Sequence, residues 1–368
     1  MTGFDVPEGI YLLSHSVGCL PRVAKQALND HYLSPWSENG GDAWPNWLEH
    51  IDTFCDRIAM VINGAGGDVC PQSNLSSGLT KYLLAAFPVS GKKRVLMHGT
   101  SFPSMGFVVS ALASHGFELV LIDDTANPTD PETWEAALSN NIDIALVSHV
   151  YSNTGMCAPV EAISQMCQAR NIRCVVDAAQ SIGVIPIDVQ QWQADVVLGS
   201  CVKWLCGGPG AGFMWINPTH IEQLQPVDVG WFSHENPFEF DIRHFAYRHD
   251  AKRFWGGTPS VAPYVIAASS VQYLLDAGIE NIASHNKALQ RTVLASNPAL
   301  SERINMQALG GTLCLSFSAN VTDKLSDALT DIGARFDRRG NALRLSFHIY
   351  NSADDAAKVA DVLSNATR

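Results

Sequence analysis

The sequence predicts an α/β fold, with a large domain built on a mostly parallel sheet and a smaller α+β C-terminal domain. Two observations lead to this prediction. Between Lys93 and Trp215, apolar strand-like runs alternate with helical stretches, which is typical of βαβ units. After the long helical run at Pro259–Leu275 this alternation ends, and the remaining strand-like runs have helical stretches on both sides, which is typical of an α+β domain. The expected divisions are an N-terminal arm at residues 1–20, a large domain at 21–265 and a C-terminal domain at 266–368.

The predicted strands of the large domain are mostly apolar, so helices should cover both faces of the sheet. These strands are expected at Arg94–Gly99, Phe117–Asp123, Ile142–Val150, Cys174–Ala179, Asp195–Ser200 and Ala211–Ile216. Helices are expected at Leu79–Phe87, Phe107–His115, Pro131–Ser139 and Val160–Arg170. Ligands of such sheets bind beyond the carboxyl ends of the strands. Four polar residues are predicted near such ends: Asp123, His149, Asp177 and Lys203.

The C-terminal part begins after a long helix predicted at Pro259–Leu275, which has a proline near its start and Gly278 after its end. Strands are expected beyond it at Thr312–Ser318 and Ala342–Tyr350, with helices at Asp323–Ile332 and Ala353–Ser364.

Composition narrows the class of protein. The 368 residues are 46% hydrophobic and 16% charged, as in a globular chain with a large core, and the net charge of −12 argues against nucleic acid or an anionic membrane as partner. The nine cysteines are scattered without CxxC spacing, so we expect no metal site, no disulfide framework and a reducing, cytoplasmic location. Since the N-terminal residues include no basic region and no long apolar stretch, we expect neither a signal peptide nor a membrane helix.

Lys203 carries the strongest chemical signal. It follows the strand-like run Ala194–Gly199 and precedes a loop with five glycines or prolines in six positions, Gly207–Gly212. Asp177 lies in the neighbouring predicted strand. A lysine and a carboxylate placed in this way suit a Schiff base to pyridoxal 5′-phosphate (PLP), with the aspartate holding the pyridine nitrogen protonated. The alternative is a solvated lysine beside an ordinary turn.

Other residues have both a functional and a structural interpretation. Residues 74–78 (NLSSG) could bind a phosphate at a helix start or be a simple N-cap. Phe102 could stack on a cofactor ring or complete the core, and His149 could contact a ligand or be a satisfied buried histidine. Trp231 lies in an aromatic loop that could be a subunit contact. Arg344, inside an apolar strand, could clamp a carboxylate or form a structural salt bridge.

Taken together, these segments resemble the class V aminotransferase superfamily of fold-type-I PLP enzymes, and most closely kynureninase. The resemblance covers nearly the whole chain, through HSVGCLPR, NLSSG, SFPSM, SHVYSNTG, DAAQSIGVIPIDV, GSCVKWLCGGPGAGF, GWFSHENPF, RFWGGTPSV and RLSFHIYN. It implies a large domain with a seven-stranded sheet, a homodimer with shared active sites, and an amino acid as substrate.

The resemblance also implies residue roles. Lys203 would carry the cofactor and Asp177 would face the pyridine nitrogen, with Phe102 stacked on the ring. Further cofactor contacts would come from Leu75, Ser76, His149, Gln180 and Ser200, and, across the dimer, from Trp231 and Thr258. Arg344 would hold the substrate carboxylate near His15 and Ser16.

Four positions depart from kynureninase. Val202 stands where kynureninases have a tyrosine, Gln180 replaces a histidine, Met105 an aspartate and His15 an asparagine. The reaction therefore stays open between hydrolytic Cβ–Cγ cleavage of a kynurenine-type substrate, transamination, and C–S lyase or desulfurase chemistry. Outside these, the chain could be a PLP-fold binding module without catalysis, although the intact Asp177, Lys203 and Arg344 count against this. A nucleotide-binding enzyme would need a glycine-rich phosphate-binding motif directly after a predicted strand. No predicted strand of this sequence is followed by such a motif.

Overall fold

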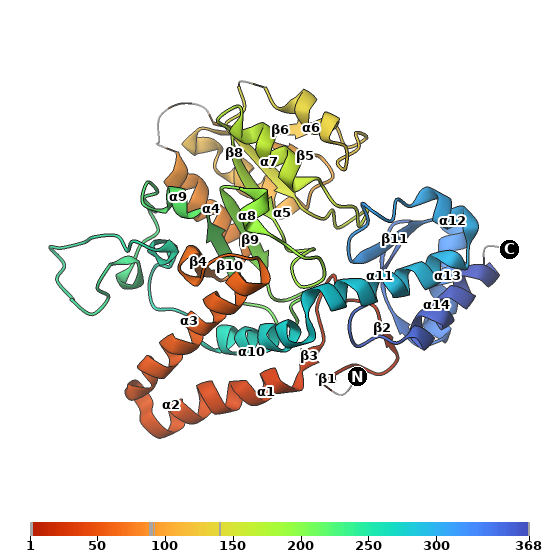
Figure 1. Ribbon diagram of the computed structural model, residues 1–368, viewed down its shortest axis with the longest axis horizontal. Coiled ribbons are helices and arrows are strands. Elements are labelled where there is room, and N and C mark those ends of the chain that lie inside the picture. The colour runs from red at the N-terminus through yellow and green to blue at the C-terminus, as the bar shows by residue number, and fades with distance from the viewer. Residues whose placement is uncertain (1–2, 88–90, 92, 140, 367–368) are drawn as a thin grey trace.

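A seven-stranded sheet organises the large part of the molecule (Figure 1). The computed structural model describes residues 3–87, 91, 93–139 and 141–366; the first two residues of the predicted arm and the last two of the predicted C-terminal domain lie outside this range. The strand order is β4-β10-β9-β8-β7-β5-β6, and β10 runs antiparallel to both neighbours while the rest pair in parallel. The strands are β4 (Val69–Gln72), β5 (Lys93–His98), β6 (Phe117–Ile122), β7 (Ile144–Ser148), β8 (Arg173–Asp177), β9 (Val196–Ser200) and β10 (Gly212–Ile216).

Alternate side chains of these strands enter two different cores, as the period of two requires. Val175 packs on one face with residues of α4 and α5, and Val176 packs on the other with residues of α3, α7 and α10. The fold-type-I α/β prediction is confirmed. The helices of this part are α4 (Leu75–Ala86), α5 (Pro103–Ala111), α6 (Pro131–Ala137), α7 (Val160–Gln168), α8 (Val189–Trp192), α9 (Pro218–Ile221) and α10 (Ala262–Ala277).

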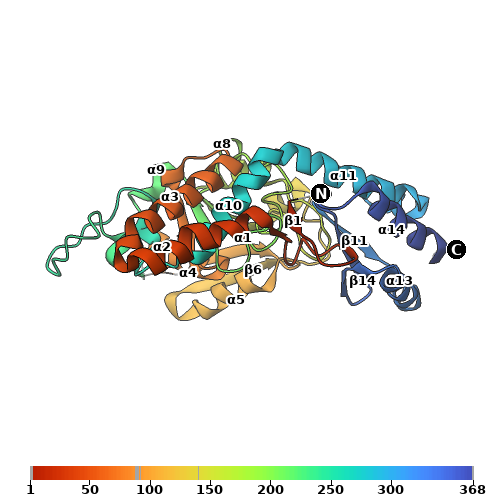
Figure 2. The same cartoon turned by 90° about the horizontal axis from the view of Figure 1, so that it is seen from below.

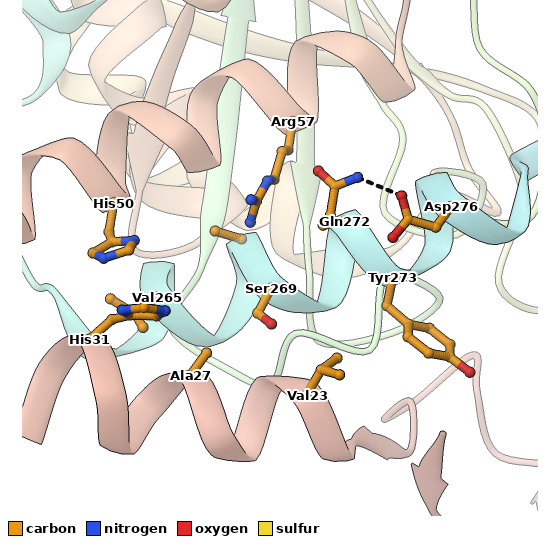
Figure 3. A pocket seen from close by; sticks show the side chains of 11 residues that line it. Val23, Ala27, His31, His50, Arg57, Val265, Ser269, Gln272, Tyr273 and Asp276 are labelled. Carbon is orange, nitrogen blue, oxygen red and sulfur yellow. Dashed lines mark hydrogen bonds between the residues drawn. The ribbon is translucent and has the colours of Figure 1, made fainter. Parts of the chain in front are cut away.

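The sequence analysis did not predict the three N-terminal helices, which are α1 (Arg22–Leu28), α2 (Ser34–Asn39) and α3 (Trp44–Val61). A π-helical turn at Asn29–Leu33 joins the first two. Helices α1, α3 and α10 lie side by side and leave a groove of about 230 Å³ between them, in which the rings of His31 and His50 are 4.3 Å apart (Figure 3). Short 3₁₀ helices occur at Gly40–Ala43, Gly66–Asp68, Ala113–His115, Trp231–Ser233 and Ala251–Phe254.

The C-terminal part lies at one end of the sheet and has its own apolar core (Figures 1 and 2). An antiparallel sheet of order β11-β14-β13 packs against helices there. Ile10 and Leu12 from the N-terminal segment belong to the same core, so the beginning of the chain packs against the C-terminal part. The elements are α11 (Ile279–Ala295), α12 (Pro298–Arg303), β11 (Thr312–Ser316), α13 (Ala319–Asp331), β12 (Ala334–Arg335), β13 (Asp337–Arg339), β14 (Ala342–Ser346) and α14 (Ala353–Ala366).

Two short pairings involve the N-terminal segment. Strand β1 (Phe4–Asp5) pairs with β3 (Leu20–Pro21), and β2 (Ile10–Tyr11) pairs in parallel with β12. The exact division into an arm and two domains stays a prediction. Among the described residues, no helix combines the length and the hydrophobicity needed to cross a membrane.

Gly18 ties this N-terminal segment to the lysine loop. Its N–H donates to the Val202 carbonyl at 2.9 Å, and a Cβ placed on it would lie 2.2 Å from the backbone oxygen of Lys203. Backbone cannot yield as a flexible side chain can, so Gly18→Ala should displace Lys203. We expect a lower cofactor content and a lower melting temperature, measured by absorbance and calorimetry. The exposed Gly67, with no atom within 4 Å of its Cβ position, is the control; an unchanged Gly18→Ala protein would contradict this packing argument.

Candidate active site

Lys203 lies in the loop that follows β9, half-buried at the carboxyl edge of the sheet. Burial lowers the pKa of its amine; the Asp177 carboxylate opposes this, and the charges of Arg344 and Arg339 add to the lowering. A lowered pKa raises the fraction of free amine at neutral pH. The residue is therefore suited to act as a nucleophile and as a base.

Asp177 ends β8, the strand next to β9, and is buried. Its Oδ1 accepts a hydrogen bond from the Ala179 N–H at 2.9 Å. Burial raises the pKa of the carboxyl, while Lys203 and the Ala179 N–H act against that rise. A buried carboxylate is costly unless a positive group faces it, so this position favours a protonated ring nitrogen as its neighbour.

One cavity of about 240 Å³ contains both residues. The aromatic ring of Phe102, at the start of α5, lies beside the lysine, with Nζ 5.7 Å from the ring centroid. The cavity brings together seven of the residues that the sequence analysis selected: Leu75, Ser76, Phe102, Asp177, Gln180, Ser200 and Lys203. It shares no lining residue with the groove of Figure 3.

Leu75 and Ser76 begin α4, so the cavity meets the free N–H groups of a helix N-terminus. The helix starts four residues earlier than its apolar pattern predicts. Asn74 is the reason, because its side chain caps the helix by accepting from the Ser77 N–H at 2.9 Å. The N-cap interpretation of NLSSG is confirmed for Asn74, and the phosphate role of its neighbours, which line the cavity, stays a prediction.

His149 does not line this cavity. Its neighbours Ser148 and Val150 do, and the alternation of side chains along the strand sends His149 to the opposite face. There its ring packs edge-on against Trp192 at 4.7 Å, and burial lowers its pKa to about 4. The structure gives no contact that supports a cofactor role for His149, and that role stays a prediction.

The cavity also contains a residue that the sequence analysis did not select. Ser152 lines the cavity two positions beyond Val150, and its Oγ accepts a hydrogen bond from Arg339 at 3.3 Å. Ser152 lies in the turn beyond the end of β7, so the period of a strand does not select it. The remaining lining residues not assigned a role from the sequence are Ser104, Met105, Ala179 and Val202.

Gln180 links the cavity to the N-terminal segment. Its Nε2 donates to the His15 carbonyl at 3.1 Å, whereas its Oε1 is buried without a hydrogen-bond partner among the described residues. His15 itself is buried against Ser346, 2.7 Å away, and burial together with the Arg344 charge lowers its pKa to about 3. Ser16 is exposed beside it. His15 is thus neutral at physiological pH.

Arg344 lies in β14, where it is 2% exposed. Its Nη1 donates to Asp337 at 2.5 Å, while its Nε is buried without a hydrogen-bond partner among the described residues. The structural ion pair considered from the sequence is therefore present, but it uses only part of the guanidinium. Whether Arg344 also binds a substrate carboxylate stays a prediction.

Trp231 and Thr258 lie outside the cavity of their own chain. Trp231 is half-buried in an aromatic cluster with Phe232 and Phe238, and Thr258 is exposed. Neither residue contacts Lys203 within one chain, so their predicted roles depend on a second subunit.

The residues present fit PLP. A half-buried amine can bind its aldehyde carbon, a buried carboxylate can face the ring nitrogen, and an aromatic ring can stack on it. The helix N-terminus at Leu75 and Ser76, with Ser200 near by, can receive the phosphate.

Known proteins agree with this geometry. Residues 81–359 match the family "Aminotransferase class-V". An uncharacterized aminotransferase of Bacillus subtilis is 25% identical over 97% of this chain and 94% of its own. A kynureninase of Deinococcus radiodurans is 27% identical over 83% of this chain and 75% of its own.

Solved structures share the fold at lower identity. A cystine C–S lyase, in complex with cysteine persulfide, superposes with a TM-score of 0.87 at 18% identity and covers 97% of this chain and 98% of its own. A cysteine desulfurase from Thermococcus onnurineus NA1 gives a TM-score of 0.80 at 19% identity, over 97% and 94%. The family match spans more than half of the chain, so this protein belongs to the class V aminotransferase family of PLP-dependent enzymes.

Proposed function

We propose that this protein transforms an α-amino acid with PLP held by Lys203, and that its reaction is the hydrolytic cleavage of the Cβ–Cγ bond of a kynurenine-type substrate. The observation that carries the first part is the half-buried Lys203 beside the buried Asp177 in one cavity. The second part rests on the kynureninase relatives, which are 26–28% identical.

Three side chains have separate roles in the proposed reaction. Arg344 binds the substrate carboxylate through the part of its guanidinium that Asp337 leaves free. The free amine of Lys203 removes the proton from Cα, which its lowered pKa favours. Asp177 holds a proton at the ring nitrogen. Bound there, PLP supplies the sink for the electron pair released at Cα.

A second candidate is transamination, in which a keto acid accepts the amino group. Met105 and Val202 favour it, because both line the cavity where kynureninases have an aspartate and a tyrosine. The aminotransferase relative also aligns with more of the chain than the Deinococcus kynureninase does.

Products separate these reactions. Holoenzyme incubated with kynurenine, 3-hydroxykynurenine and a panel of amino acids, with and without a keto acid, can be analysed by mass spectrometry. Alanine and an aromatic carboxylate, formed without a keto acid, support hydrolytic cleavage. Products that require the keto acid support transamination. Loss of a β-substituent would instead support a C–S lyase, and no turnover of any substrate would contradict the proposal.

Arg344→Lys should weaken substrate binding while cofactor content stays unchanged, because lysine keeps the charge but cannot make two parallel hydrogen bonds. We expect KM to rise about 30- to 150-fold, on the order of 2–3 kcal/mol. The control is Arg338→Lys, since Arg338 pairs with Asp323 at 2.6 Å on the surface. Loss of fold or cofactor in Arg344→Lys would show that the pair with Asp337 is only structural.

We also propose a homodimer in which Trp231 and Thr258 complete the phosphate site of the partner subunit. Both lie outside the cavity of their own chain, so only a second subunit could bring them to a phosphate. Analytical ultracentrifugation of the holoenzyme should give twice the chain mass of 39.9 kDa. A fully active monomer would contradict the shared site.

A further inference from the structure

Residues 234–247 form a loop that projects beyond the sheet (Figure 1). Its base is closed by a bridge between His234 and Tyr247 and by a hydrogen bond from the Glu235 N–H to the Ala246 carbonyl at 2.9 Å. Between these points the loop has no helix or strand. Two backbone turns, closed by the Glu239 and His244 N–H groups, and several side-chain contacts shape it.

Two histidines and one glutamate converge inside this loop. The Nε2 of His234 lies 2.9 Å from Oε2 of Glu239, and the Nδ1 of His244 lies 3.0 and 3.2 Å from the two oxygens of the same carboxylate. One ligand atom from each residue lies within 4.8 Å of the others. His234 is buried, whereas Glu239 and His244 face solvent.

This spacing is close to that of a metal centre. Two ligands bound at about 2.0–2.1 Å to a tetrahedral Zn²⁺ are roughly 3.3 Å apart. Two contacts of the cluster, at 2.9 and 3.2 Å, already approach that value. Small side-chain movements would therefore seat an ion between the three groups.

The second ring nitrogen of His234 is also engaged. Its Nδ1 lies 2.9 Å from the carbonyl oxygen of Ala246 and 3.1 Å from the amide nitrogen of the same residue. Because a carboxylate oxygen can only accept, the Nε2–H of His234 donates to Glu239. A metal ion bound between the two residues would take the place of this Nε2 proton, and a backbone carbonyl that accepts from Nδ1–H is the usual support for a histidine ligand.

We propose that His234, Glu239 and His244 bind a divalent transition-metal ion of the Zn²⁺ type, with a fourth position open to water. Nearby acidic groups, Glu235 and Asp241, add negative charge to the loop. The metal would hold the loop next to Trp231. The sequence analysis expected no metal because it considered only cysteine spacing; these ligands come from histidine and glutamate.

Calorimetric titration of the holoenzyme with zinc chloride tests the site. The wild type should bind one Zn²⁺ per chain, and His244→Ala and Glu239→Gln should each weaken binding at least tenfold. His249→Ala is the matched control, because His249 is a nearby exposed histidine paired with Glu222 at 3.1 Å. It should bind zinc as the wild type does. No binding by the wild type, or equal binding by all variants, would overturn the proposal.

A second measurement does not depend on calorimetry or on catalysis. Arg243 is exposed and directly precedes His244, so trypsin should cut the loop after it. Zinc should slow this cleavage several-fold in the wild type and leave the rate in His244→Ala unchanged. Equal rates with and without zinc in the wild type would show that the three residues form only a hydrogen-bonded cluster. Cofactor content, measured in parallel, separates this outcome from any failure of the proposed reaction.

Discussion

Replacing Lys203 by alanine or arginine is expected to reduce turnover to the background rate. Alanine removes both the amine that binds the cofactor and the base at Cα; loss of the base alone costs about 10²- to 10⁴-fold. Arginine keeps a cation near Asp177 but has no amine that titrates near neutral pH. Single-turnover kinetics with the best substrate of the panel would measure the effect.

The exposed Lys358→Ala is the control for the lysine variants, since that residue pairs with Asp354 on the surface at 2.8 Å. It should retain full activity. Substantial turnover in Lys203→Arg would mean that another group removes the proton, and the assignment of the base would fail.

Asp177→Asn is expected to retain PLP and to lose turnover by orders of magnitude. An asparagine cannot hold the ring nitrogen protonated, and electrostatic contributions of this kind are worth several kcal/mol. The substitution should also lower the pKa of Lys203, because the Asp177 charge is what raises it. Turnover and cofactor absorbance measure the first effect, and the pH dependence of Lys203 labelling by an amine reagent in the cofactor-free protein measures the second.

Asp123→Asn is the matched control for Asp177. Asp123 follows β6 at the same edge of the sheet, but it is exposed, accepts hydrogen bonds from Thr125 and does not line the cavity. It should turn over substrate at the wild-type rate. If Asp177→Asn turned over substrate as fast as Asp123→Asn, the charge of Asp177 would not be needed for turnover, and its assigned role would fail.

Much of the large domain could be predicted because its signals are local. The middle residues of strands β7, β8 and β9 are apolar, and the residues at the carboxyl ends of these strands meet at one edge whatever the loops do. This rule places Asp177 and Lys203 in one cavity. It fails for His149, because it identifies the end of a strand without specifying the face to which each side chain points.

Other features depend on contacts between distant segments. Gln180 contacts His15, which is 165 residues away, and Ile10 and Leu12 pack in the C-terminal core. The partner of Arg344 is Asp337, on a three-residue strand too short to show a pattern. No periodicity or spacing reports such contacts, so the ion pair could be named only as a possibility and its partner not at all.

The central claim is that Lys203 holds the cofactor. Borohydride reduction of the holoenzyme followed by proteolysis and mass spectrometry tests it most directly, because the hydride fixes the cofactor to the amine that binds it. We expect a pyridoxyl group on the peptide containing Lys203, and no label at that peptide in Lys203→Ala. A pyridoxyl group on any other lysine, with Lys203 unlabelled, would contradict the claim.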